Sequence, residues 1–257
     1  MTIPTSIVSL LYRTVVRLIV LLTALPFHEC AHAWMANKLG DPTAKNQGRL
    51  TLNPMKHLDP MGAVLMLVAG FGWANPVPVN PNNFKNRKGG MALTALAGPV
   101  SNLLLAFVCT VVYKILAYAG YAASGFPGEI LSSLAQAFLL MVSLNVGLGV
   151  FNLVPIPPLD GSRILNLILP EKTYFQIMKY ERIIMLALFA AIFIGLLDGP
   201  LSFVEGQIYR LLDLLTRFVD WIAEVVVGCV GGRCEYEGFQ LVEGRWSCFF
   251  FSSPSTN

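Results

Sequence analysis

The sequence predicts an all-α polytopic membrane protein, a bundle of about four to six transmembrane helices with short extended or re-entrant segments near a candidate site. Of its 257 residues, 55% are hydrophobic and only 13% are charged, whereas about 25% are charged in an ordinary soluble domain. The mean hydropathy is +0.62. Burying so much apolar surface requires lipid as well as a protein core. We therefore expect an integral membrane protein whose surroundings are the lipid bilayer.

Four apolar stretches meet or approach the length of about 20 residues that a transmembrane helix needs. They are Ser6–Leu39, Met91–Ala119, Ile130–Val154 and the shorter Ile183–Leu197. The net charge is only +3, and no basic stripe is interleaved with aromatic residues. The sequence therefore gives no support for binding to nucleic acid.

Shorter segments complete the predicted bundle. Met61–Ala74 is too short to cross a bilayer comfortably and runs into the proline-rich segment Asn75–Asn80, so we expect a re-entrant hairpin or a short extended segment there. The alternation in Gly48–Asn53 predicts a strand. Spaced charges in the apolar segment Ser202–Val227 predict an amphipathic helix.

The distribution of Lys and Arg predicts an orientation in the membrane. Three connections carry basic residues, at Lys38–Lys56, Lys85–Lys88 and Lys172–Arg182, whereas Gly120–Glu129 has none. Because positive loops remain on the cytoplasmic side, we place the first three connections there.

The motif His28-Glu29-Cys30-Ala31-His32 is the strongest chemical signal in the sequence. Two histidines four residues apart project from one face of a helix, so both imidazoles can reach one zinc ion. Glu29 lies beside them and can take a proton from water. A pair of packed core histidines is the alternative, but ionisable groups inside an apolar helix are costly and are usually functional.

A catalytic zinc site needs a third protein ligand and an open position. His57, the one histidine outside the motif, lies in a turn-rich loop, whereas Asp160 follows a proline-stiffened segment. Asp160 is also a plausible N-cap for a helix that starts at Gly161. Because His28 and His32 lack a partner, we favour Asp160 as the ligand and expect His57 to be structural.

Together these motifs resemble the site-2 protease family of intramembrane zinc metalloproteases, in particular its compact prokaryotic members. The resemblance is carried by His28–His32, by Pro157-Pro-Leu-Asp-Gly161, and by Gly40–Lys45, Gly48–Pro54, His57–Pro60 and Ala97–Asn102. It implies that His28, His32 and Asp160 bind one Zn²⁺ per chain and that Glu29 is the general base. The substrate it implies is a transmembrane helix of another protein. With the orientation predicted above, we expect the site to lie toward the cytoplasmic side of a prokaryotic cell membrane.

Further expectations concern residues around this centre. Asn152 and the segment Asn75, Pro76 and Val77 are expected to bind the substrate backbone, although Asn152 could equally satisfy broken helix backbone. Gly98 and Asn102 are expected to serve close helix contact and an interhelical hydrogen bond.

The domain prediction is a membrane-embedded metalloprotease domain at residues 1–228, followed by a tail of unknown role at residues 229–257. Two other functions are alternatives: an inactive relative that binds or escorts transmembrane helices, and a metal transporter. Glu29 argues against the first, since a binding module needs no base. The lack of internal repeats argues against the second.

Overall fold

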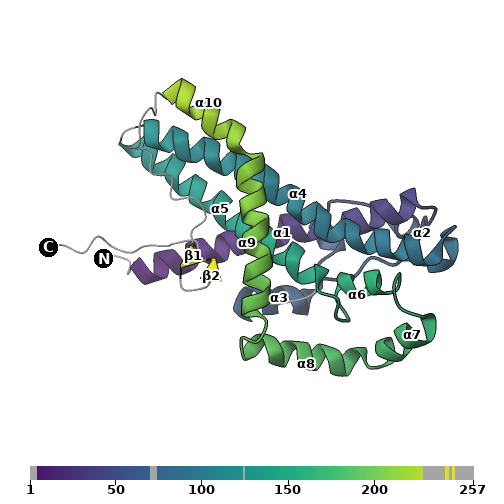
Figure 1. Cartoon of the computed structure of the whole chain (residues 1–257). Coiled ribbons are helices and arrows are strands. Elements are labelled where there is room, and N and C mark those ends of the chain that lie inside the picture. Colours follow the sequence, from purple (N-terminus) through teal and green to yellow (C-terminus); the bar gives the residue numbers. More distant parts are fainter. Residues whose placement is uncertain (1–4, 70–73, 124, 228–240, 243–244, 247–257) are drawn as a thin grey trace. The chain divides into compact units, whose positions relative to one another are not determined.

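A computed structural model describes residues 5–69, 74–123, 125–227, 241–242 and 245–246 (Figure 1). Its helices are α1 (Thr5–Lys38), α2 (Thr43–Asn46), η1 (Pro54–Lys56), α3 (Pro60–Ala69), η2 (Pro81–Asn83), α4 (Arg87–Ala122), α5 (Phe126–Leu153), α6 (Asp160–Leu165), α7 (Glu171–Lys179), α8 (Glu181–Phe193), α9 (Asp198–Leu215) and α10 (Arg217–Val227). A hairpin of two-residue strands, β1 (Leu241–Val242) and β2 (Arg245–Trp246), is antiparallel. The predicted all-α membrane class is confirmed.

Two of the described helices, α4 and α5, are long and apolar enough to cross a membrane. A third span results if α8 and α9, which meet the same criterion only together, are counted as one broken span. The chain is therefore polytopic, and the predicted total of four to six spans stays a prediction.

The chain forms two compact units. The first comprises Met1–Ala106 and Leu144–Ala191, and the second comprises Phe107–Ser143 and Ile192–Asn257. Helices α4 and α5 contribute residues to both. All candidate site residues lie in the first unit.

Helix α1 ends where the chain can turn sharply toward the site. The N–H of Asp41 donates to the carbonyl of Ala36 at 2.9 Å, and Gly40 has a φ of 106°, a left-handed conformation that favours glycine. This turn leads directly into α2. Behind it, Ala33 of α1 and Ala44 of α2 pack with Val77 in a small apolar core.

In the second unit, a buried lysine joins α4 to the helices around Thr216. The Nζ of Lys114, fully buried in an apolar helix, lies 2.9 Å from Asp213 Oδ1 and 2.7 Å from Asp220 Oδ2. The hydroxyl of Tyr118 donates to Asp220 Oδ1 at 3.0 Å. A buried charge in such a helix is costly unless it is paired, so this cluster fastens the end of α9 and the start of α10 to α4.

Two local expectations need correction or refinement. The strand predicted at Gly48–Asn53 is not formed: this stretch has irregular, bent backbone, and the carbonyl of Thr51 instead accepts from His57 Nε2 at 2.8 Å. The helix predicted at Ser202–Val227 is interrupted at Thr216, whose hydroxyl donates to the carbonyl of Leu212 at 2.8 Å. Most of the tail predicted at residues 229–257 lies outside the described residues.

Candidate metal centre

His28 and His32 lie one turn apart on α1 and point their Nε2 atoms at the same place. The two Nε2 atoms are 3.0 Å apart. Both side chains are buried, as is that of Glu29, with relative exposures of 5%, 8% and 7% in the order His28, His32, Glu29. The helical spacing thus has the consequence expected from the sequence.

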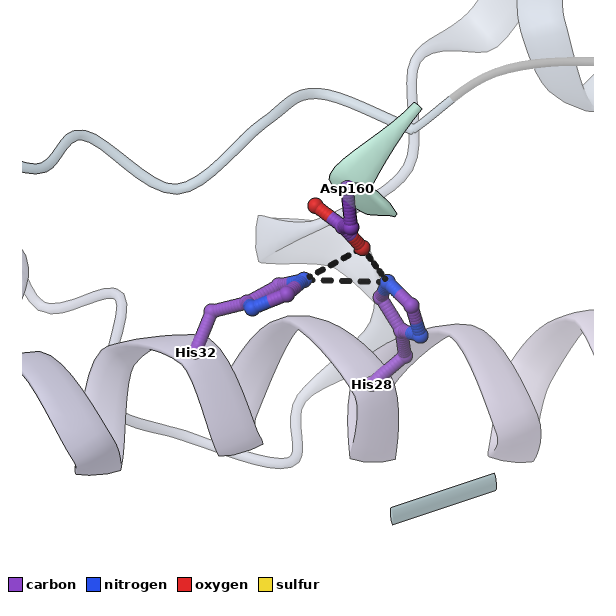
Figure 2. A group of neighbouring side chains, drawn as sticks. All are labelled: His28, His32 and Asp160. Atoms are coloured by element: carbon purple, nitrogen blue, oxygen red, sulfur yellow. Dashed lines mark hydrogen bonds and ion pairs between the residues drawn. The ribbon is translucent and has the colours of Figure 1, made fainter. Parts of the chain in front are cut away.

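Asp160 completes the group from the opposite side (Figure 2). Its Oδ2 lies 3.0 Å from His28 Nε2 and 3.1 Å from His32 Nε2. It is the first residue of α6 rather than its N-cap: the N-cap is Leu159, and no side chain caps this helix. Asp160 is therefore not the N-cap of α6, the role that the sequence offered as the alternative to metal binding.

Gly161, the residue after Asp160, allows the start of α6 to lie against backbone carbonyl groups at the end of α5. A Cβ at Gly161 would lie 2.3 Å from the carbonyl oxygen of Leu153 and 2.5 Å from that of Val154. Real Cβ atoms essentially never approach backbone so closely, so only glycine allows this contact. The close approach holds Asp160 against the end of α5.

The proton positions on His32 can be worked out from its neighbour. Its Nδ1 lies 2.7 Å from the carbonyl oxygen of Thr94, and a carbonyl can only accept. Nδ1 therefore carries the hydrogen, and in the neutral ring Nε2 presents a lone pair. This lone pair faces the oxygen of Asp160 at 3.1 Å, an arrangement that needs a cation or an additional proton between the two atoms.

A zinc ion fits this donor set. Within the described part of the chain, His28, His32 and Asp160 form a group whose ligand atoms all lie within 4.8 Å of one another. Ligands about 2.0–2.1 Å from a tetrahedral zinc are about 3.3 Å apart, close to the separations of 3.0–3.1 Å observed here. Two imidazoles and one carboxylate are also a typical set for a catalytic site with an open fourth position.

The Asp160 carboxyl has the charge that a metal ligand needs. Burial alone raises its pKa, but the hydrogen bonds from His28 and His32 and the charge of these rings outweigh burial and hold the pKa well below its usual range. A ligating carboxylate must be deprotonated, and this one is ionised at neutral pH.

One face of α4 closes the site. Thr94, Gly98 and Asn102 are spaced four residues apart, so they lie along one side of this helix. A Cβ at Gly98 would lie 2.4 Å from both Cε1 and Nε2 of His32. Asn102 contacts the other imidazole, with its Nδ2 3.2 Å from His28 Nδ1. The expected close helix contact and interhelical hydrogen bond are both present, and both involve the histidines themselves.

The carboxylate of Glu29 is held by backbone from the proline-rich segment. The N–H of Val77 donates to Glu29 Oε2 at 3.1 Å. Because Glu29 lies next to His28 on α1, this bond brings the segment Asn75–Asn80 to the edge of the histidine pair. Asn75 and Pro76 are exposed, whereas Val77 is buried.

The ends of this segment are fastened as well. The N–H of Asn75 donates to the carbonyl of His57 at 2.8 Å, and Arg49 donates to the carbonyl of Asn75. At the other end, the N–H of Asn80 donates to Asp41 Oδ2 at 2.7 Å. An isolated antiparallel bridge pairs Leu58 with Ala74 just before it. The segment Asn75–Asn80 forms neither a helix nor a strand, and its prolines predicted that it would not be a regular helix.

His57 and Asn152 serve backbone atoms in this structure. His57 is fully buried and lies in the loop that holds Asn75, outside the group formed by the two motif histidines and Asp160. The amide of Asn152 donates to the carbonyl of Leu148 in its own helix at 2.9 Å. Its role toward a substrate stays a prediction.

Comparisons with known proteins identify the family of this chain. A sequence model described as peptidase family M50 matches residues 121–196. YwhC of Bacillus subtilis, named as an inferred zinc metalloprotease, is 46% identical over 175 residues, which cover 66% of this chain and 78% of that protein. The chain belongs to peptidase family M50, the site-2 protease family. It is thus an integral membrane protein of a metalloprotease family.

Other M50 relatives are more distant. Rip2 of Mycolicibacterium smegmatis is 32% identical over 145 residues, 54% of this chain and 52% of that protein. MJ0611 of Methanocaldococcus jannaschii is 30% identical over 142 residues, 54% of this chain and 63% of that protein. Both are also named as inferred zinc metalloproteases. No solved structure matches the chain.

Three contacts around the M50 site were not predicted from the sequence: the bond from Val77 to Glu29, the hydrogen-bonding group around Asp41, and the carbonyl of Thr94. All three involve backbone atoms, which leave no trace in residue identity. The four-residue spacing of Thr94, Gly98 and Asn102, which matches that of His28 and His32, is a signal that could have indicated the facing helix.

Proposed function

We propose that this chain is an intramembrane zinc metalloprotease that hydrolyses a peptide bond in or near a transmembrane helix of a substrate protein. His28, His32 and Asp160 would hold one Zn²⁺, and Glu29 would act as general base. The observation that carries the proposal is the convergence of His28 Nε2, His32 Nε2 and Asp160 Oδ2, which lie 3.0–3.1 Å from one another, about as far apart as the ligands of one zinc ion.

Zinc, when bound, supplies a Lewis acid that lowers the pKa of water and polarises a carbonyl group. The residues of the chain do the rest. Glu29 takes the proton from the attacking water and returns it to the leaving amine. The N–H of Val77 keeps one oxygen of Glu29 fixed, so the other oxygen is available for proton transfer.

The substrate would be bound beside this base. Asn75 and Pro76 are exposed next to Val77, and an extended peptide can pair with such a segment through backbone hydrogen bonds. A peptide bond inside a helix has its polar groups paired within the helix, so the substrate must unwind locally. Asn152 is proposed to bind the unwound backbone after leaving its bond to Leu148.

The location follows from the same proposal. The basic residues of the connections that hold this segment, Lys45 and Lys85 among them, support a site toward the cytoplasmic side, and we propose that the membrane is a prokaryotic cell membrane. Cleavage there would release part of a membrane protein, as in regulated intramembrane proteolysis.

The proposal is tested by Glu29→Gln in the purified full chain. Gln keeps the shape and an acceptor for the Val77 N–H but cannot take up a proton. We expect zinc content equal to wild type and cleavage of a transmembrane substrate slowed by about 10²–10⁴-fold. The control is Glu129→Gln, which removes an exposed carboxylate at the start of α5 and should leave both quantities unchanged.

Any other result of these measurements would indicate a different role for Glu29 or a different function for the chain. Cleavage by Glu29→Gln at near the wild-type rate would rule out Glu29 as the base. Loss of zinc in that variant would make Glu29 a ligand. A wild-type chain that binds zinc and a transmembrane helix but releases no fragment would be an inactive escort, and transport of zinc into vesicles would indicate a transporter.

A further inference from the structure

The side chain of Asn102 lies against the edge of His28 that faces away from Asp160. Asn102 is fully buried, and its Nδ2 is 3.2 Å from His28 Nδ1. Its Oδ1 has no hydrogen-bond partner among the described residues. A buried amide oxygen without a partner costs about 1–3 kcal/mol, so its presence beside a site calls for an explanation.

The orientation of this amide decides which nitrogen of His28 carries the hydrogen. With Nδ2 toward the ring, the amide donates to Nδ1, and the hydrogen of the neutral imidazole lies on Nε2, where it can donate to Asp160 Oδ2 at 3.0 Å. With the amide turned by half a rotation, Oδ1 accepts from Nδ1–H and Nε2 presents a lone pair. The oxygen and nitrogen of an amide have nearly the same shape, so both orientations fit the same space.

A metal ligand needs the second arrangement, because a histidine binds a metal through the lone pair of a neutral ring. His32 is already fixed in that form by the backbone carbonyl of Thr94. Among the described residues, His28 Nδ1 instead faces the side-chain amide of Asn102.

We propose that Asn102 is a positioning residue whose side-chain oxygen accepts the hydrogen bond of His28 Nδ1–H when zinc is bound. This inference rests on the proposed zinc site. Asn102 supports both forms of His28: its N–H group serves the metal-free form, in which His28 donates to Asp160, and its oxygen serves the metal-bound form. The two histidines are thus oriented by different means, His32 by fixed backbone and His28 by a side chain that can turn.

The test measures zinc affinity of the purified full chain in detergent, by competition with a chromophoric chelator. Asn102→Leu removes both polar atoms, and we expect zinc affinity to fall about 10–100-fold, as when other outer partners of ligating histidines are removed. Asn102→Asp keeps only acceptors, so it should bind zinc with less than about a 10-fold change. Leu104→Ala is the control in the same helix: this side chain is exposed and belongs to no part of the proposed site, so affinity should be unchanged.

Two results would overturn the inference. One is wild-type affinity in Asn102→Leu. The other is an affinity of Asn102→Asp that falls about 10–100-fold, because this would mean that His28 needs the N–H of the amide and not its oxygen. Thermal unfolding in excess chelator shows whether Asn102→Leu folds. If it does not fold, the zinc affinity of Asn102→Asp alone tests the inference. A wild-type chain that binds no zinc would instead refute the proposed function, so the two failures are distinguishable.

Discussion

At the scale of single residues, the imidazoles of His28 and His32 leave no room for a side chain on the helix that faces them. Gly98 of α4 supplies that space: its absent Cβ would lie 2.4 Å from Nε2 of His32 and 2.7 Å from Cε1 of His28. The positions of both imidazoles therefore depend on a glycine at position 98.

Gly98→Ala should displace the histidines and lower zinc affinity by at least about 10-fold, since small displacements of a built site are costly. Alanine raises helix propensity by about 1 kcal/mol over glycine, so a weaker α4 cannot account for the loss. Zinc competition in detergent measures the effect. Gly89→Ala in the same helix is the control, because its Cβ would approach only the exposed side chain of Asn86, at 3.0 Å. Equal zinc affinity in both variants would show that the histidines can shift without cost.

The sequence is informative about residues whose chemistry is rare in apolar helices. His28, Glu29 and His32 stand out because such side chains are costly in a membrane, and Asp160 followed from the need for a third ligand. The sequence could not show that Asp160 does not cap α6, since an Asp before Gly161 fits either role. The hydrogen bond from the N–H of Val77 to Glu29 could not be predicted from the sequence, because a main-chain donor is present at almost every residue.

At the scale of elements, the turn after α1 holds the proline-rich segment in place. The buried carboxylate of Asp41 accepts from the N–H of Asn80 and from Nδ2 of Asn83, both at 2.7 Å, and from the N–H and hydroxyl of Thr43. Burial alone raises the pKa of Asp41, but these hydrogen bonds outweigh it and lower the pKa. One carboxylate thus ties α1, α2 and the segment before η2 together.

Asp41→Asn should destabilise the chain by about 1.5–3 kcal/mol at neutral pH, because hydrogen bonds to a charged acceptor are lost and an N–H group then faces other donors. A lowered pKa in the folded chain contributes stability above the unfolded value of about 3.9 and loses it as pH falls through the folded value. The difference between wild type and variant should therefore be constant from about pH 5 to 8 and shrink below about pH 4. Thermal unfolding in detergent across this range checks it. A difference that persists unchanged in acid would show that the charge of Asp41 is not what stabilises the turn.

Element existence was more predictable than element detail. Long apolar runs indicated α1, α4 and α5 to within a few residues, because length and hydropathy suffice for such helices. The alternation in Gly48–Asn53 was misleading: without a neighbouring strand its backbone groups bond to a loop instead, as between Thr51 and His57. The helix break at Thr216 could not be predicted in this way, because no proline lies between Ser202 and Val227.

At the scale of the whole molecule, an M50 family membrane protein places one ionised carboxylate between two oriented histidines. Gly98 and the amide of Asn102, both on α4, lie against the histidines, and the N–H of Val77 holds the adjacent Glu29. The number of zinc ions bound per chain tests the proposed site most directly.

The decisive measurement is the zinc content of purified wild-type, Asp160→Ala and His57→Ala chains by elemental analysis after dialysis against a weak chelator. We expect about one zinc per chain in the wild type and in His57→Ala, and well below half of that in Asp160→Ala, because two remaining ligands hold zinc poorly. Full zinc occupancy in a folded Asp160→Ala chain, or loss of zinc in a folded His57→Ala chain, would contradict the proposed site.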